Sequence, residues 1–87
     1  HPNILEASVY GIPDERLGEI LCCSLTIEYN EKISQDDLKN YLKNYLASFK
    51  IPTHFDFHRE QLPRTASGKI YKLELRKEME KKLSVSN

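Results

Sequence analysis

The run from Glu19 to Glu28 constrains this chain more than any other stretch, because its apolar residues alternate along it. Every second position carries an apolar side chain, at Leu21, Cys23, Leu25 and Ile27, so these side chains share one face of an extended strand. The positions between them are mixed, at Ile20, Cys22, Ser24, Thr26 and Glu28. We therefore expect a strand with one face in a hydrophobic core and the far end of the other face in water.

A second apolar run precedes this strand, from Ile4 to Ile12, and it stops at the turn signal Pro13-Asp14-Glu15. Its β-branched residues predict another strand. Only a short loop separates the two predicted strands, so we expect them to pair in antiparallel fashion. A chain of 87 residues can bury a single modest core, which indicates one domain.

A helix is predicted to begin after Ser34, whose hydroxyl can accept a hydrogen bond from a backbone N–H of the first turn. Asp36 and Asp37 lie in that turn, where carboxylates favour the positive end of a helix. Apolar residues then recur at steps of three and four, at Leu38, Tyr41, Leu42, Tyr45, Leu46 and Phe49. This spacing predicts one apolar stripe packed on the core. The opposite face is polar, with Lys39, Asn40, Lys43 and Asn44. Pro52 ends the segment, because the residue before a proline disfavours helix.

Polar and aromatic residues alternate from His54 to Glu60, which predicts a third strand. Phe55 and Phe57 should share one face, and His54, Asp56 and His58 the other. Two imidazoles that flank a carboxylate can bind a transition metal. No further cluster of ligands lies nearby in the sequence, so we expect no metal site.

Apolar residues at Leu73, Leu75, Met79 and Leu83 predict a final helix, which basic residues surround. We expect the tail from Ser84 to Asn87 to be unordered. Together these elements predict an α+β domain: a small antiparallel sheet of about three strands packed with two or three helices.

Charge and cysteine content exclude several classes of function. Thirteen basic residues balance thirteen acidic ones, so nothing favours nucleic acid or an anionic membrane as a partner. No apolar run approaches the ~20 residues of a membrane span.

Cys22 and Cys23 are adjacent on a predicted strand, so we expect one buried and one outward thiol in a reducing compartment, most simply the cytoplasm. The chain begins with His1 rather than methionine, and we expect that it was cut from a longer protein.

Residues 61–71 contain the most suggestive chemistry, at Lys69. The preceding residues 65–68 are threonine, alanine, serine and glycine, and a loop this small can approach a ligand closely. Gly68 tolerates unusual backbone dihedrals, and Ile70 can anchor the exit of the loop. A lysine ammonium carries three donors and can bridge two oxyanions. The alternative is a solvated lysine without a function. A phosphate-binding loop of the G-x-x-x-x-G-K-[ST] type is excluded, because position 63 is proline and position 70 is isoleucine.

Three segments, in this order and spacing, resemble the C-terminal domain of the adenylate-forming enzymes. They are V-Y-G-I-P-D-E-R-L-G-E at 9–19, L-K-N-Y-L-A-S-F-K-I-P at 42–52 and L-P-R-T-A-S-G-K-I at 62–70. This superfamily includes acyl-CoA synthetases, the adenylation domains of nonribosomal peptide synthetases, and luciferases. The resemblance covers nearly the whole chain. It implies that residues 1–87 are a single C-terminal lid domain excised from a larger enzyme.

The resemblance also implies roles for individual residues. Lys69 matches the lysine that bridges the substrate carboxylate and the α-phosphate of ATP during acyl-adenylate formation, where a cation stabilises developing charge. The loop that presents it matches Arg64, Thr65, Ser67 and Gly68. Lys43 lies near a position where a basic residue can contact the CoA nucleotide. Such lid domains rotate so that a different face serves thioester formation with CoA or a carrier-protein thiol. ATP and Mg²⁺ would be bound mainly by the N-terminal adenylation domain of the same chain.

The most direct interpretation is an AMP-forming acyl-CoA synthetase, an acid–thiol ligase that joins a carboxylic acid to CoA. The family's glycine-rich hinge stretch is missing, so we expect the fragment alone to be inactive. Two alternatives stay open: the adenylation-domain lid of a peptide synthetase, and a non-catalytic protein-interaction module with the same fold. The segment 9–19 and the charged final helix favour the CoA ligase. A further hypothesis is acylation of Lys69, which would remove its charge.

Overall fold

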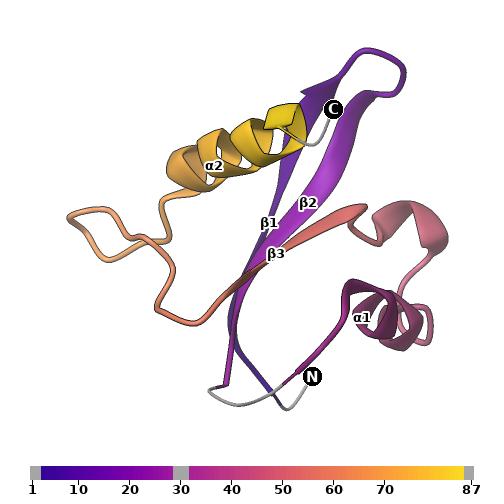
Figure 1. The fold of residues 1–87 in the computed structure, drawn as a ribbon, viewed down its shortest axis with the longest axis horizontal. Coiled ribbons are helices and arrows are strands. Elements are labelled where there is room, and N and C mark those ends of the chain that lie inside the picture. The colour runs from indigo at the N-terminus through magenta and orange to yellow at the C-terminus, as the bar shows by residue number, and fades with distance from the viewer. Residues whose placement is uncertain (1–2, 29–31, 86–87) are drawn as a thin grey trace.

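The computed structural model describes residues 3–28 and 32–85 and shows a three-stranded sheet with a helix on each face (Figure 1). The elements are β1 (Ile4–Asp14), β2 (Gly18–Ile27), α1 (Gln35–Leu42), a 3₁₀ turn η1 (Ser48–Lys50), β3 (His54–His58) and α2 (Lys72–Val85). The predicted α+β class is confirmed. The polar turn expected around residues 29–31 lies outside the described residues.

Strands β1 and β2 form the expected antiparallel hairpin, in which Val9 lies opposite Cys23. The side chain of Asp14 shapes the turn between them, because its Oδ2 accepts hydrogen bonds from the backbone N–H groups of Arg16 (3.2 Å) and Leu17 (2.8 Å). Such side-chain bonds are typical of aspartate in turns. Gly18 then begins β2 with a φ of 82°, a left-handed conformation that favours glycine.

Strand β3 pairs in parallel with β2, with Ser24 opposite Asp56, and the strand order is β1-β2-β3. The sheet is therefore mixed, and the antiparallel expectation holds for the first pair of strands alone. The reason is the long connection that contains α1: it returns the chain to the start of β2, where Thr53 N donates to Leu21 O (2.9 Å). Parallel neighbours require a crossover of this kind.

Helix α2 covers the face of β2 that contains Cys22 and Ser24, which the sequence predicted to be partly exposed to solvent. The core on this side consists of Tyr10, Ile12, Cys22, Leu62, Leu75 and Met79, with Leu75 fully buried. Cys22 and Ser24 are fully buried there as well. Since Cys23 is buried on the opposite face, the expectation of one outward thiol is wrong.

Helix α1 covers the other face. Its core contains Cys23, Leu25, Ile27 and Leu38, and Phe55 and Phe57 pack against it, as their predicted orientation required. Ser34 caps the helix as expected, because its Oγ accepts from Asp37 N at 3.0 Å. Helices on both faces thus leave β2 buried from Cys22 to Ile27.

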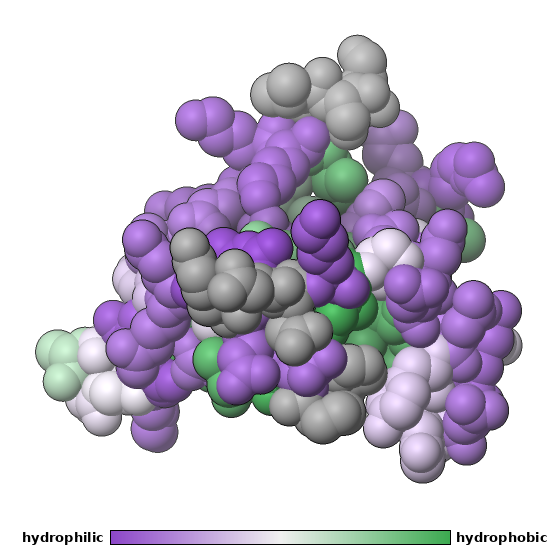
Figure 2. All heavy atoms as spheres, turned by 60° about the horizontal axis from the view of Figure 1, so that its bottom comes forward, coloured by the Kyte–Doolittle hydropathy of each residue, from purple (hydrophilic) through white to green (hydrophobic). Residues whose placement is uncertain are grey.

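The apolar stripe predicted for α1 is correct for its first half only. The helix ends at Leu42, and Tyr45 and Phe49 are 69% and 77% exposed. The chain must turn here to bring β3 beside β2, and Ala47 is already extended (φ −64°, ψ 151°). Figure 2 shows the molecule turned so that the bottom of Figure 1 faces the viewer. On this side, hydrophilic side chains cover most of the surface, and hydrophobic side chains are visible in its middle.

Helix α2 continues through Ser84 to Val85, so the expectation of an unordered tail is wrong for these two residues, and residues 86–87 lie outside the described part. No described helix combines the length and the apolar character that crossing a membrane would require.

Candidate functional site

Residues 64–70, which we name the Lys69 loop, form a small closed turn that projects from the body of the molecule (Figure 1, left). Arg64 and Ile70 form an antiparallel bridge at its base. Within the loop, Thr65 N donates to Lys69 O (2.7 Å) and Gly68 N donates to Thr65 O (2.9 Å). The exit of the loop is held because Tyr71 N donates to Pro63 O (2.8 Å). The backbone of the loop is therefore ordered by its own hydrogen bonds.

Gly68 gives the loop its shape. Its φ is 89°, a region that other residues rarely adopt, although a Cβ at this position would meet no atom within 4 Å. The requirement for glycine is therefore conformational rather than steric. Thr65 Oγ1 and Ser67 Oγ share a hydrogen bond of 3.0 Å, and Lys69, which directly follows Gly68, is exposed.

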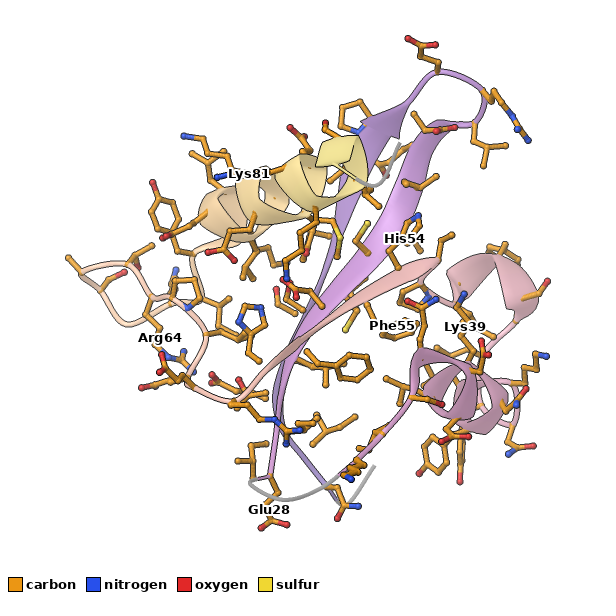
Figure 3. All side chains as sticks on the ribbon, viewed as in Figure 1. Glu28, Lys39, His54, Phe55, Arg64 and Lys81 are labelled. Atoms are coloured by element: carbon orange, nitrogen blue, oxygen red, sulfur yellow. The ribbon has the colours of Figure 1, made fainter. Side chains whose placement is uncertain are left out.

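Arg64 holds the loop from its base (Figure 3). Its Nη1 donates to Gly68 O at 3.0 Å, and its Nη2 forms an ion pair with Glu6 Oε2 of β1. The guanidinium is thus engaged on both sides by groups of this chain. We infer that Arg64 contributes to the shape of the loop, while Lys69 offers the exposed cation.

Glu6 is a residue that the sequence analysis missed. Besides Arg64, its carboxylate contacts Leu62 and Thr26: Oε1 accepts from Leu62 N at 2.5 Å and from Thr26 Oγ1 at 3.4 Å. The side chain is only 17% exposed. The available signal was a single carboxylate inside the apolar run from 4 to 12, but two of its partners, Leu62 and Arg64, lie more than 50 residues away in the sequence.

Lys43 lies at the C-cap of α1, and α1 covers one face of the sheet. The Lys69 loop lies beside the core under α2, on the opposite face. It is exposed, and its Nζ donates to Asn40 Oδ1 at 3.3 Å. Close to it in sequence, Lys50 Nζ lies 5.7 Å from the centroid of the Phe49 ring. The structure therefore places Lys43 on a part of the surface that is separate from the Lys69 loop.

The polar face of β3 forms an ion network with α2. Asp56 is buried, its Oδ1 accepts from Lys82 Nζ, and its Oδ2 lies 3.1 Å from His58 Nε2. Glu78 of α2 joins them: ligand atoms of Asp56, His58 and Glu78 all lie within 4.8 Å of one another, a grouping that could hold a metal ion. His54 does not belong to this group. Both oxygens of Asp56 already have partners, so we interpret the network as a connection between β3 and α2.

The described residues offer no activated cysteine nucleophile. Burial raises the pKa of Cys22 and of Cys23 to about 11, so both remain thiols at neutral pH. Burial also raises the pKa of Tyr10 to about 12, against the opposing effect of its 2.7 Å hydrogen bond with Ser24 Oγ. These groups belong to the core, and the accessible chemistry of the loop region comes from Lys69.

Comparison with known proteins gives one consistent result. The sequence profile of the AMP-binding enzyme C-terminal domain matches residues 1–69. The oxalate–CoA ligase of Saccharomyces cerevisiae is 44% identical over 70 residues, which are 80% of this chain and 13% of that protein. The mitochondrial medium-chain acyl-CoA ligase ACSF2 of Rattus norvegicus is 38% identical over 85 residues, 98% of this chain and 14% of that protein.

Solved structures share the fold of this chain. A fatty acyl CoA synthetase of Mycobacterium tuberculosis superposes with a TM-score of 0.77 at 35% identity, over 90% of this chain and 15% of that one. The chain thus spans only 13% to 15% of the length of the proteins that it matches. With the profile match, the shared sequence and the shared fold, this chain belongs to the C-terminal domain family of the AMP-binding, adenylate-forming enzymes.

Proposed function

We propose that this chain is the C-terminal lid of an ATP-dependent acyl-CoA synthetase, and that it supplies Lys69 to the adenylation step. The observation that carries this proposal is the exposed Lys69 in a loop that hydrogen bonds hold closed. The relatives that are CoA ligases support the same reaction class. The N-terminal adenylation domain of a longer parent chain, a carboxylic acid and CoA are the partners that this function requires.

In the first half-reaction, a carboxylate oxygen attacks the α-phosphorus of ATP, the bond to the β-phosphate oxygen breaks, and pyrophosphate leaves. Negative charge concentrates on the carboxylate and the α-phosphate as they approach each other. The ammonium of Lys69 can donate to both groups and stabilise that charge. The small side chains of Ala66 and Ser67 leave room for the loop to approach the reactants.

The Lys69 loop itself does not suit a magnesium ion. Glu6 is the carboxylate that contacts the loop, and its oxygens already accept from Arg64 and Leu62. Mg²⁺ prefers carboxylate oxygens and phosphates. We therefore assign ATP and its magnesium mainly to the N-terminal domain, where the ion would neutralise phosphate charge.

In the second half-reaction, the thiol of CoA attacks the acyl carbonyl and AMP leaves. We propose that Lys43 contacts CoA at this stage. Lys43 and the Lys69 loop lie on different sides of a domain that measures 35 × 35 × 24 Å. A rotation of the whole lid would present first one side and then the other to the same active site, which supports a lid that serves both half-reactions.

The test uses the full-length parent enzyme and assays each half-reaction separately. Lys69→Ala should lower pyrophosphate exchange by about 100-fold or more, which corresponds to ~2.7 kcal/mol of transition-state stabilisation. Thioester formation from preformed acyl-adenylate should persist. Lys72→Ala is the matched control, because Lys72 is an exposed lysine three positions further on and both half-reactions should survive its loss.

Lys43→Ala should show the reverse pattern, with a higher KM for CoA and unchanged pyrophosphate exchange. A carrier-protein thiol that is accepted in place of CoA would favour a peptide-synthetase lid. If Lys69→Ala leaves both half-reactions at wild-type rates, the catalytic role is wrong, and a protein-interaction module becomes the better interpretation.

A further inference from the structure

We propose that Glu6 is a positioning residue for adenylation, which acts on Lys69 through Arg64. This inference rests on the proposed function of the Lys69 loop. Glu6 belongs to β1, far from the loop in sequence, and no contact between Glu6 and Lys69 is involved. Its carboxylate instead holds Arg64, the first residue of the Lys69 loop, and Leu62, which lies two residues before it.

The contacts form a continuous path from the sheet to the lysine. Glu6 Oε1 accepts from Leu62 N (2.5 Å), and Glu6 Oε2 pairs with Arg64 Nη2. Arg64 Nη1 then donates to Gly68 O (3.0 Å). That carbonyl belongs to the peptide bond that leads into Lys69. The orientation of this peptide is therefore tied to β1 through one carboxylate and one guanidinium.

This connection matters because the outer part of the loop has little packing of its own. Ala66, Ser67 and Gly68 are exposed, whereas Leu62 before the loop is buried and Ile70 at its end packs partly on the same core. A long lysine side chain magnifies any movement of its backbone. Displacement of a catalytic group by about 1 Å can reduce a rate by ~100-fold.

The carboxylate also sets the charge of the loop. Without Glu6, Arg64 would be a second free cation in the Lys69 loop, and it could compete with Lys69 for the same phosphate or carboxylate oxygens. Paired with Glu6, whose side chain is 17% exposed, the guanidinium is directed toward the sheet. The loop then presents Lys69 to the reactants.

The experiment uses the full-length parent with Glu6→Gln and Glu6→Asp. Glutamine keeps an acceptor for Leu62 N but removes the charge that holds Arg64, and aspartate keeps the charge with a shorter reach. We expect Glu6→Gln to lower kcat of pyrophosphate exchange by ~10- to 100-fold, with a smaller change in KM for ATP. Thioester formation from preformed adenylate should stay within about twofold of wild type, and Glu6→Asp should restore part of the loss.

Lys82→Ala is the matched control, because it breaks another carboxylate–cation pair of the same domain, Lys82 with Asp56, which lies under α2. It should lower the thermal unfolding temperature without changing the ratio of the two half-reactions. Arg64→Gln provides a second route: it breaks the same connection from the side of the loop and should reproduce the selective loss of exchange.

Lys69→Ala separates the possible outcomes. Adding Glu6→Gln to Lys69→Ala should cause no further loss of exchange, because Glu6 acts through the lysine. The inference is wrong if Glu6→Gln and Arg64→Gln both keep wild-type exchange while Lys69→Ala loses it. It is also wrong if the Glu6 variants slow both half-reactions equally, as a structural role alone would do. If Lys69→Ala itself has no effect, the proposed function fails, and this inference fails with it.

Discussion

Two glycines of this chain allow a controlled test of whether the geometry of the Lys69 loop serves the proposed adenylation. Gly18 and Gly68 have φ values of 82° and 89°, and a Cβ on either would meet nothing within 4 Å. Alanine at each position therefore meets no steric clash but must adopt a left-handed backbone. Gly18 is the first residue of β2, directly after the turn that joins β1 to β2, whereas Gly68 immediately precedes Lys69.

The expected cost is nearly equal at both sites. A left-handed conformation costs a residue with a Cβ about 1–2 kcal/mol. Alanine also restricts the unfolded chain, which offsets this cost by about 0.4–1 kcal/mol. We expect each substitution to lower the free energy of unfolding by about 1 kcal/mol, measured by urea denaturation of the 87-residue chain.

The two variants should differ in catalysis. In the full-length parent, Gly68→Ala should lower pyrophosphate exchange by ~10-fold or more, because relief of the strain reorients the peptide that leads into Lys69. Gly18→Ala should keep wild-type exchange. If neither variant loses stability, the argument from backbone strain is refuted. If both lose stability and both keep full exchange, the shape of the loop does not position the lysine.

Three further predictions concern the core. Leu38→Ala should lower the free energy of unfolding, measured by urea titration, by about 2–4 kcal/mol, because Leu38 is only 3% exposed. Phe49→Ala should change it by less than about 0.5 kcal/mol, because Phe49 is 77% exposed. Equal costs would contradict the observed end of α1. Cys22 and Cys23 have pKa values raised from 9.0 to about 11, so the native state holds their protons more tightly than the unfolded state. Their contribution to stability is complete below about pH 9 and is lost as the pH rises through about 11. Urea titrations across this pH range will measure the loss. Rapid labelling of the native protein by a thiol reagent at pH 7 would contradict the burial of the two cysteines. Asp56→Ala removes the carboxylate that both Lys82 and His58 contact. It should lower the free energy of unfolding by about 1–2 kcal/mol; the loss stays this small because Lys82 is 60% exposed and regains hydrogen bonds to water. An unchanged urea midpoint would show that the network does not stabilise the domain.

Local patterns in the sequence predicted most of the elements. The strict alternation around Leu25 predicted β2, and the Ser34 hydroxyl predicted the start of α1 through a contact three residues away. Phe55 and Phe57 were expected on one face of β3, where they now pack against the α1 core. Each of these features depends on neighbours within a few residues, so a single sequence contains the information. The turn before Lys69 was predicted for the same reason, from its small residues and Gly68.

Only the tertiary structure decided which partner covers each face. Cys22 is buried because α2, formed 50 residues later, lies over it, and β3 is parallel because the chain crosses over through α1. The same holds for the candidate site: the sequence indicated Lys69 and Arg64, but the support from Glu6 depends on an ion pair across 58 positions. Periodicity reports which side of an element is apolar. It does not report what packs there, because that depends on long-range contacts whose partners no local pattern specifies.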